Sequence, residues 1–325
     1  MLPEPALRRL LDRLDGASRL EDGGWEGWEV RRIDGGRNSL LYRAVAPGHD
    51  LAIKFAMDDW RDRVGREYNS LAALRRAGLD VAPEPVLLDR TRYGTPLVVQ
   101  TWLAGDKAAV PDADDGWGGL AQHLAHVHRV TPGTTGIELP ACTVYARTAE
   151  EARERVWDQL AFIPDPALPA GLRALLRTLE AAEFPNWPPS PVTLCRLDNH
   201  LDNYIRRPGT WASVDWEYSG WGDPAFDVAN LVTHVSWIGV PQKRWVSFVD
   251  RYCALVDDDT APVRIRAYCQ ILIVWWAARL ARYLYEIPNG KDRRLVDWPA
   301  GWQADIEAKC AHYVALAQQV GGERT

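Results

Sequence analysis

Alternating apolar and polar side chains dominate the first hundred residues of the chain. Four segments have the pattern of strands, half-buried in the first two and buried in the last two: residues 28–33, 40–45, 51–55 and 96–103. Apolar residues recur at helical spacing in one further segment, at Val64, Tyr68, Leu71 and Leu74. The pattern predicts a leading helix over residues 1–21 and a mostly antiparallel sheet over residues 25–101, with one helix packed on it.

Beyond residue 116 the pattern is mostly helical, with one Pro-rich interruption over residues 184–191. Ala104-Gly105-Asp106 follows the fourth predicted strand and marks the expected hinge. At 325 residues, of which 47% are hydrophobic, the chain is long enough for two cores. We therefore predict an α+β fold with two lobes, a small antiparallel-sheet N-lobe over residues 1–103 and a larger, mostly helical C-lobe over residues 104–325.

A glycine-centred turn joins the first two predicted strands. It has the sequence Asp34-Gly35-Gly36-Arg37-Asn38-Ser39. Glycines at the tip of a hairpin let backbone amides approach a phosphate, because no Cβ stands in the way. The expected phosphate contacts are Gly35, Gly36, Asn38 and Ser39.

A single lysine, Lys54, interrupts the apolar run at residues 51–55. A lone lysine in a strand is most often an edge charge or a snorkelling side chain. Here Glu67 follows thirteen residues later in the predicted helix. A strand lysine fixed by a helix glutamate is how kinases hold the α- and β-phosphates, so this pair is a candidate nucleotide contact.

Two acids and an amide near the middle of the chain have the spacing that phosphoryl transfer from a magnesium nucleotide requires. Asn203 follows Asp198 by five positions, the interval at which the kinase catalytic loop places its base and a magnesium-binding amide. A turn at residues 206–209 and a returning strand would deliver Asp215, a suitable magnesium ligand, beside Asn203. Asp and Asn also form ordinary turns, so the spacing gains weight only from the signals upstream.

The order of these signals resembles the aminoglycoside phosphotransferase and choline kinase-like family, the small-molecule branch of the protein-kinase-like fold. The resemblance covers residues 28–237 and is most specific in one run, Asp215-Trp216-Glu217-Tyr218-Ser219-Gly220-Trp221-Gly222-Asp223-Pro224-Ala225-Phe226-Asp227-Val228-Ala229. The roles that it implies are a catalytic base at Asp198, magnesium ligands at Asn203 and Asp215, a phosphate contact at Lys54 oriented by Glu67, and structural support from Asp227.

Arg196-Leu197 stands where the family usually has His-Gly. An arginine there could support the loop by binding backbone carbonyls or Asp227, or it could pair with Asp198 itself, because its planar guanidinium offers five donors. If Arg196 occupied Asp198, turnover would fall, and the chain would be a nucleotide-binding pseudokinase with little activity. We rank that hypothesis below the enzyme, since the lysine and magnesium positions are present.

The resemblance implies ATP as the phosphate donor, with GTP as an alternative, and Mg²⁺ as the metal. Backbone groups of the hinge read the base in kinase-like folds, so Gln100 and Trp102 are the expected adenine positions. The first acceptor hypothesis is an amino-sugar of the aminoglycoside type, and the alternative is choline or another amino alcohol. A protein kinase is disfavoured because the chain has no D-F-G or A-P-E motif and no room for an activation loop.

Sixteen tryptophans supply aromatic faces that can stack on sugars or attract ammonium groups. Trp221 is the favoured acceptor contact because it follows the metal loop directly. Four acids could neutralise an amine, Glu217, Asp223, Glu286 and Asp297, and Glu217 is the first choice among them. A net charge of −6 would suit a cationic acceptor, although it does not say where the charges lie.

Composition excludes several other classes of protein. A pI near 5.7 gives no basic footprint for nucleic acid. The longest apolar run, residues 271–278, is too short to cross a bilayer. Five cysteines are widely spaced, odd in number and lack a C-x-x-C pair, so we expect free thiols and a cytoplasmic setting. The sequence leaves the oligomeric state open.

Overall fold

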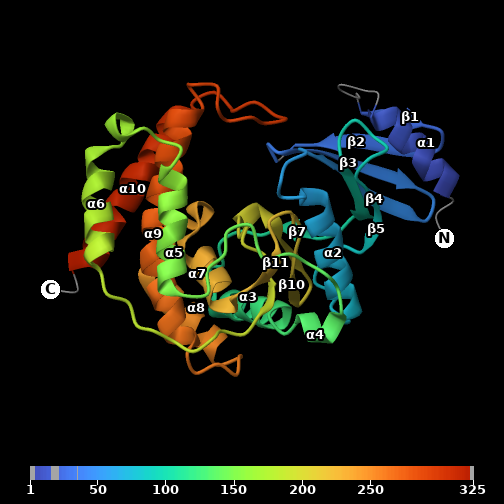
Figure 1. The fold of residues 1–325 in the computed structure, drawn as a ribbon. Helices are drawn as coiled ribbons and strands as arrows, with labels where there is room; N and C mark the ends of the chain where they lie inside the picture. The colour runs from blue at the N-terminus through green and yellow to red at the C-terminus, as the bar shows by residue number, and fades with distance from the viewer. Residues whose placement is uncertain (1–3, 16–21, 35, 323–325) are drawn as a thin grey trace.

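A computed structural model describes residues 4–15, 22–34 and 36–322 of the chain. Figure 1 shows a small sheet-rich half that carries the N-terminus beside a larger helical half that carries the C-terminus. The predicted α+β architecture with two lobes is confirmed. The exact lobe boundary at residue 103 stays a prediction. Gly35, one of the expected phosphate contacts, lies outside the described residues.

Six antiparallel strands form the sheet of the small half, in the order β1-β2-β3-β4-β6-β5. Their bounds are β1 Gly23–Trp25, β2 Trp28–Ile33, β3 Ser39–Ala46, β4 His49–Ala56, β5 Pro85–Asp89 and β6 Leu97–Thr101. Lys54 lies on β4, opposite Leu41 of β3 and Val98 of β6. Because β4 has a strand on each side, Lys54 is not an edge charge.

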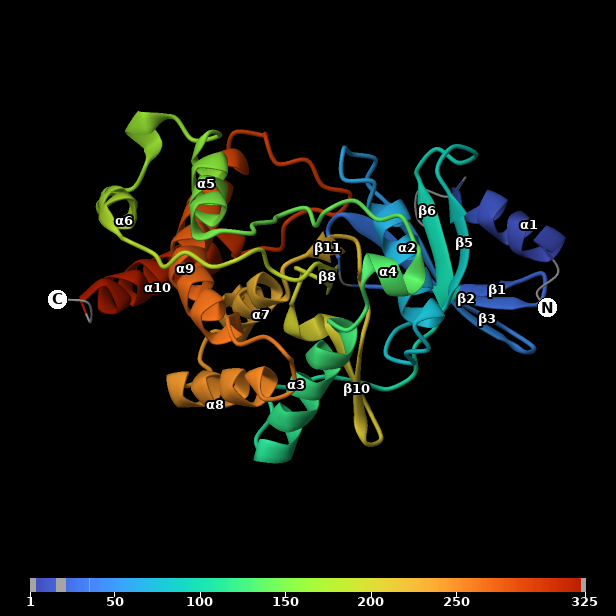
Figure 2. The same cartoon turned by 60° about the horizontal axis from the view of Figure 1, so that its bottom comes forward.

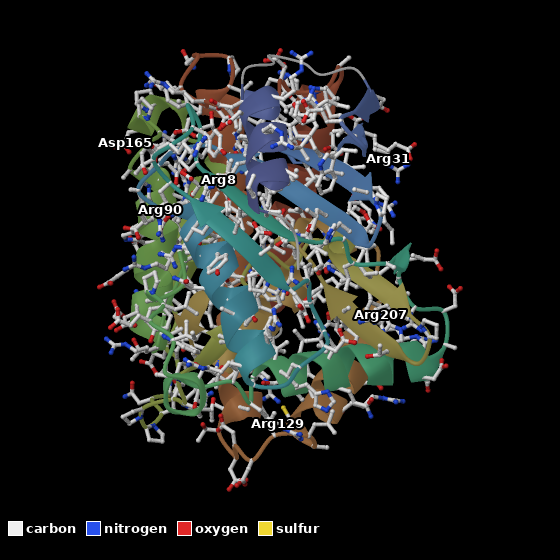
Figure 3. The ribbon with its side chains drawn as sticks, turned by 90° about the vertical axis from the view of Figure 1, so that its right-hand side faces the viewer. Arg8, Arg31, Arg90, Arg129, Asp165 and Arg207 are labelled. Carbon is white, nitrogen blue, oxygen red and sulfur yellow. The ribbon has the colours of Figure 1, made fainter. Side chains whose placement is uncertain are left out.

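The first helix, α1 (Glu4–Asp15), covers the outer face of the sheet. Its four leucines, Leu7, Leu10, Leu11 and Leu14, are buried in one cluster with Trp28, Val30 and Leu97 of the strands. Figure 3 looks onto this face and shows α1, with Arg8 labelled, lying across the strands. The outer face is therefore closed by apolar packing, which leaves the opposite face for Lys54.

The second helix, α2 (Arg63–Arg76), lies between the sheet and the helical half (Figure 1). Near its start, Val64 packs against Ala56 of β4. Further along, Leu71 packs in one cluster with Leu194 and Trp216 of the helical half. Since α2 touches both halves, its side chains can reach groups from either one.

A long central helix, α9, organises the helical half. The helices of this half are α3 Asp114–Val127, α4 Pro132–Thr135, α5 Ala149–Leu160, α6 Ala170–Ala181, α7 Pro224–Thr233, α8 Gln242–Cys253, α9 Ala261–Glu286 and α10 Trp302–Gly322, with 3-10 turns at Asp165–Ala167, Leu201–Asn203 and Val235–Trp237. Helices α5, α7 and α10 pack along α9, as Figures 1 and 2 show. No helix within the described residues has the length and apolar character needed to cross a membrane.

Short strands position two loops in front of this helical core. They are β7 Asp106–Lys107, β8 Thr193–Cys195, β9 Tyr204–Arg207, β10 Thr210–Ser213 and β11 Gly220–Gly222. β9 and β10 form the predicted hairpin, and β8 pairs with β11. The backbone N–H of Val214 donates to the carbonyl oxygen of Asn203 at 2.9 Å. The loop at residues 196–203 therefore lies directly beside the loop at residues 214–219.

A connection between α9 and α10, residues 287–301, returns to the small half (Figure 1). We call it the strap. The N–H groups of Leu295 and Val296 donate to the carbonyl oxygen of Arg37 at 2.9 and 3.2 Å. The strap thus binds the glycine-centred turn between β2 and β3 from the opposite half of the molecule.

Two non-glycine residues in these loops have left-handed backbone conformations. Leu197 and Asp215 each have φ of 61°. A Cβ is disfavoured there by about 1–2 kcal/mol, because it lies too close to a carbonyl oxygen. At Leu197, the family's usual glycine would adopt this conformation without that cost.

We expect glycine to be more stabilising than alanine at residue 197. Leu197→Gly and Leu197→Ala both remove the buried side chain, so the difference between them isolates the backbone. Chemical denaturation should give Leu197→Gly a free energy of unfolding about 1 kcal/mol above that of Leu197→Ala. Ala229 in helix α7 provides the control, because Ala229→Gly should destabilise by about 1 kcal/mol. Equal or reversed stabilities at residue 197 would contradict a strained loop.

Candidate active site

A buried lysine of the small half meets carboxylates from both halves of the molecule. Lys54 Nζ is 2.8 Å from Glu67 Oε2, 2.5 Å from Asp215 Oδ1 and 3.0 Å from Glu217 Oε2. The structure thus brings together Lys54, Glu67 and Asp215, which the sequence assigned to nucleotide and metal. Glu217, which the sequence assigned to the acceptor, lies in the same cluster and not apart from it.

A second cation, Arg63 at the start of α2, holds the other side of Glu217. Its guanidinium is 2.5 Å from Glu217 Oε1 and 3.1 Å from Asp59 Oδ2. It also donates to the hydroxyl of Tyr218 at 3.2 Å. Sequence reasoning missed Arg63, because arginines near helix starts are common and no motif marks this one.

Carboxylates outnumber cations in this cluster. The four acids are Asp59, Glu67, Asp215 and Glu217, against the three cations Lys54, Arg61 and Arg63, of which Arg61 pairs with Asp59 at 2.7 Å. Burial, with a contribution from Glu217 and Glu67, raises the pKa of Asp215 to about 7 although Lys54 opposes the shift. Burial alone would lower the pKa of Lys54, but its three carboxylate partners hold it well above the usual value. The site therefore carries surplus negative charge.

This surplus fits a divalent cation. Glu67, Asp215 and Glu217 can each offer one carboxylate oxygen, and these oxygens lie within 4.8 Å of one another. Glu67 Oε1 is buried and has no hydrogen-bond partner. Hard oxygen ligands with uncompensated negative charge are what Mg²⁺ prefers. The donor set is thus compatible with the metal that the sequence suggested.

Asp198 lies in the loop after β8, with its carboxylate held by two side chains. Asn203 Nδ2 donates to Asp198 Oδ2 at 3.2 Å, which leaves the amide oxygen of Asn203 for a metal. His234 Nε2 lies 3.7 Å from Asp198 Oδ1. Burial would raise the pKa of Asp198, but His234 and the charges of His200 and Arg196 lower it below its usual value. Asp198 is therefore ionised at neutral pH.

Arg196 is fully buried, and its guanidinium binds backbone atoms. It donates to the carbonyl oxygens of Asp198 and Val214 at 3.1 and 3.0 Å. It lies over the rings of Tyr204 and Trp216, 5.0 and 4.8 Å from their centroids. The sequence left open whether Arg196 binds backbone carbonyls or pairs with Asp198. In the structure Arg196 joins the two loops through their carbonyl oxygens and makes no hydrogen bond to the carboxylate of Asp198.

Asp227, in the first turn of α7, stabilises the loop that carries Asp198. Its carboxylate accepts from the N–H groups of Arg196 and Leu197 at 2.9 and 3.0 Å, and from Asn199 Nδ2 at 2.8 Å. His128 Nε2 lies 3.1 Å away on its other side. These contacts anchor the backbone on both sides of Asp198. Asp227 itself is fully buried.

His234 is a further residue at the site that the sequence did not reveal. Ser236 N–H donates to its Nδ1 at 3.2 Å. Because an N–H can only donate, Nδ1 carries no proton in the neutral ring, and Nε2 presents its proton toward Asp198. Trp276 of α9 packs against His234 at 4.9 Å between ring centroids. No local motif precedes His234, which follows α7 and reaches Asp198 only through the fold.

The glycine-centred turn contributes fewer free groups than expected. Asn38 Nδ2 donates to the hydroxyl of Tyr218 at 3.2 Å, and Asn38 Oδ1 accepts from Arg294 of the strap at 2.9 Å. Ser39 begins β3, and a Cβ on Gly36 would come within 3.0 Å of its hydroxyl. Asn38 therefore joins the two halves, whereas Gly36 is exposed at the tip.

The other predicted contacts, Gln100, Trp102 and Trp221, differ in how far they are free to bind a ligand. Gln100 is buried on β6, and its Oε1 has no partner. The N–H of Trp102 donates to the carbonyl oxygen of Asp50 at 2.8 Å, so this amide is not free to read a base. Trp221 on β11 packs against the apolar cluster that contains Leu71. It is thus part of the packing between α2 and the helical half.

Known proteins resemble the chain in both sequence and fold. A thiamine kinase of Escherichia coli O17:K52:H18 is 27% identical over 205 residues, which are 62% of this chain and 59% of that protein. The chain thus spans about three-fifths of the length of the thiamine kinases that it matches.

Solved structures extend the likeness of fold to almost the whole chain. A candidate aminoglycoside phosphotransferase from Ralstonia eutropha JMP134 has a TM-score of 0.68 at 17% identity and covers 96% of this chain and 98% of its own. A choline/ethanolamine kinase family protein from Mesorhizobium loti has a TM-score of 0.63 at 20% identity, with 94% of each chain covered. A spectinomycin phosphotransferase in complex with ADP and spectinomycin has a TM-score of 0.59 at 12% identity, with 95% and 97% covered.

The match to a family covers more of the chain than the match to the thiamine kinases. A sequence profile of the phosphotransferase enzyme family matches residues 29–268, which include every residue of the cluster around Lys54 and both loops. On this match and on the geometry of the cleft, the chain belongs to the phosphotransferase enzyme family.

Proposed function

We propose that the chain transfers the γ-phosphate of ATP to a hydroxyl group of a small molecule, with Asp198 as the base. The observation that carries this proposal is the meeting of Lys54, Glu67 and Asp215 within 3 Å beside a loop in which Asn203 holds Asp198. GTP is the alternative donor, and it would leave the roles of these residues unchanged.

The residues around Lys54 divide the work of binding the nucleotide. Lys54 would contact the α- and β-phosphates, and Glu67 would hold its ammonium group in place. Asp215 and Asn203 would bind Mg²⁺, with Glu217 as a further oxygen donor nearby. When bound there, Mg²⁺ would supply positive charge that offsets the negative charge of the phosphates during transfer.

Asp198 would orient the acceptor hydroxyl and take its proton. Its lowered pKa keeps it ionised at neutral pH, although a weaker base takes a proton less readily. Asn203 fixes one carboxylate oxygen, and His234 lies beside the other. The pseudokinase hypothesis requires Arg196 to occupy the carboxylate of Asp198. Arg196 binds carbonyl groups instead, which favours an active enzyme.

The acceptor is a small alcohol in this proposal, first an amino-sugar and second choline or another amino alcohol. Similar proteins are named for spectinomycin, choline and thiamine, which supports a small organic acceptor. Three acids that might have neutralised a cationic acceptor are already paired: Glu217 with Lys54 and Arg63, Asp223 with Arg264, and Glu286 with Arg282. Charge pairing with these acids therefore gives no support for a cationic acceptor.

We expect Asp198→Asn to abolish most of the transfer. With Mg-ATP and a panel of amino-sugars, amino alcohols and hydroxy amino acids, kcat should fall about 10²–10⁴-fold because the base is lost. The KM for ATP should change little. Asp202→Asn is the matched control, since Asp202 is an exposed acid in the same loop. Equal kcat in wild type and Asp198→Asn would contradict the role of Asp198.

Asp215→Asn should stabilise the metal-free protein at pH 8 while it abolishes transfer. The pKa of Asp215 is raised from 3.8 to about 7, so its ionisation costs the folded state stability as pH rises through that interval. Removing the charge should increase the free energy of unfolding by up to about 4 kcal/mol at pH 8 and by less than half as much at pH 5.

Calorimetric melting with and without Mg²⁺ tests both parts of this expectation. Magnesium should raise the Tm of the wild type more than that of Asp215→Asn, because the variant lacks one metal ligand. An equal rise in both proteins would place the metal elsewhere, and a destabilised variant at pH 8 would show that the surplus charge is not as described.

A further inference from the structure

Three arginines gather around two aromatic rings where the strap meets α9. Tyr283 of α9 and Trp298 of the strap have ring centroids 5.3 Å apart. The guanidinium of Arg37 lies 3.7 Å from the Trp298 centroid, that of Arg279 lies 4.2 Å from the Tyr283 centroid, and that of Arg294 lies 5.5 Å from it. We call Arg37, Arg279 and Arg294 the arginine cluster.

The arginine cluster has one carboxylate partner for three positive charges. Arg294 pairs with Asp292 at 2.9 Å. The partners of Arg279 are neutral, the hydroxyl of Tyr283 at 2.8 Å and Gln159 Oε1 at 3.4 Å. Arg37 makes no ion pair with any residue that the structure describes.

The pKa shifts of Tyr283 and Arg37 agree with an excess of positive charge in the arginine cluster. Burial would raise the pKa of Tyr283, but Arg279 and Arg294 lower it below its usual value. The pKa of Arg37 is lowered by burial and by the charge of Arg294, which together outweigh the nearby charges of Asp292 and Asp305. Half-buried guanidinium groups without a counter-charge are costly, and a bound anion would relieve that cost.

Helix α9 places the arginine cluster near Asp198. Arg279 follows Trp276 by three residues and Tyr283 follows it by seven, so the three side chains share one face of the helix. Trp276 packs against His234, which lies 3.7 Å from Asp198. The rise of an α-helix puts Tyr283 about 10 Å along the axis from Trp276, which is the length of a small molecule.

A second route leads from the arginine cluster to the nucleotide side. Arg294 donates to Asn38, and Asn38 donates to the hydroxyl of Tyr218, which also accepts from Arg63. A cavity of about 270 Å³ opens between the glycine-centred turn and the strap, and its charged lining residues are Arg32, Asp34, Arg37 and Asp297. A small group therefore has space beside Arg37, at the end of the cavity that would have to bind the anion.

The geometry points to an oxyanion subsite: the arginine cluster binds a carboxylate or phosphate group carried by the acceptor, while the acceptor's hydroxyl reaches Asp198. Guanidinium groups suit this task because their planar forks bind two oxygens at once. This inference rests on the proposed function and narrows its acceptor to an anionic alcohol, such as a phosphorylated amino-sugar or a hydroxy acid. It reverses the cationic acceptor that the net charge suggested.

The other source of an oxyanion is the γ-phosphate of the nucleotide. The position of Arg279 argues against it, because Arg279 emerges from α9 and contacts α5 through Gln159, whereas the nucleotide contacts lie on the sheet and α2. Filling the γ-phosphate position with a non-hydrolysable nucleotide separates the two sources experimentally.

The first test measures anion binding without turnover. Inorganic phosphate is titrated by calorimetry into the full chain saturated with Mg²⁺ and AMP-PNP, beside Arg279→Gln, Arg37→Gln and the control Arg282→Gln. Arg282 is on the same helix but is already paired with Glu286 at 2.9 Å. We expect phosphate binding to persist with AMP-PNP, to weaken about ten-fold or more in the first two variants, and to stay unchanged in the control.

Three results would overturn the subsite: no phosphate binding in the wild type, loss of that binding when AMP-PNP is present, or equal binding in wild type, Arg279→Gln and Arg37→Gln. Melting curves of each variant establish that it is folded, and two variants from different segments guard against a single misfolded protein.

The second test compares acceptors that differ only in an anionic group. Glucosamine is paired with glucosamine 6-phosphate, and ethanolamine with serine. The anionic member of at least one pair should have a kcat/KM about ten-fold or more higher, and Arg279→Gln should remove that advantage through the acceptor KM with the ATP KM unchanged. Preference for the uncharged or cationic member would overturn the proposal. If no acceptor is phosphorylated, the proposed function fails, whereas the phosphate titration still decides whether the subsite exists.

Discussion

The arrangement of the cleft depends on one buried ammonium group. Lys54 reaches from the middle of the sheet to carboxylates of α2 and of the loop after β10, so a single side chain connects three segments. Burying a charge is costly unless partners surround it, and Lys54 has three carboxylate partners, more than its single charge requires. The two halves are therefore held together by one lysine, at the place where a nucleotide would bind.

The loop that carries Asp198 is stabilised by the same physical means. Asp227 accepts from its backbone N–H groups, and Arg196 donates to the carbonyls of Asp198 and Val214. Buried charges thus satisfy backbone groups that no helix or sheet could satisfy in an irregular segment. Arg196 takes the place of the family's histidine without obstructing the base, at the cost of a left-handed conformation at Leu197.

Sequence reasoning succeeded where chemistry depends on local pattern and spacing. The strand with Lys54, the helix with Glu67 and the hairpin after Asn203 each follow from periodicity over a few residues. It failed where placement depends on the tertiary fold. Nothing local tells which neighbour of Asp215 points at Lys54, so the ion pair of Glu217 with Lys54 and the packing of Trp221 near α2 were not foreseen. His234 reaches Asp198 only because α7 ends there.

Charge was the property that the sequence represented least well. A net charge of −6 averages over the surface, whereas the cleft holds two local imbalances of opposite sign. Around Lys54 the carboxylates are in surplus, and the Mg²⁺ of a bound nucleotide would bring positive charge to them. Around Tyr283 and Trp298 three guanidinium groups share one carboxylate ion pair, which is why we propose that an anion binds there. Asn38 connects the two regions, because it accepts from Arg294 of the arginine cluster and donates to Tyr218 beside Arg63. The proposed sites for the two substrates are thus linked by hydrogen bonds.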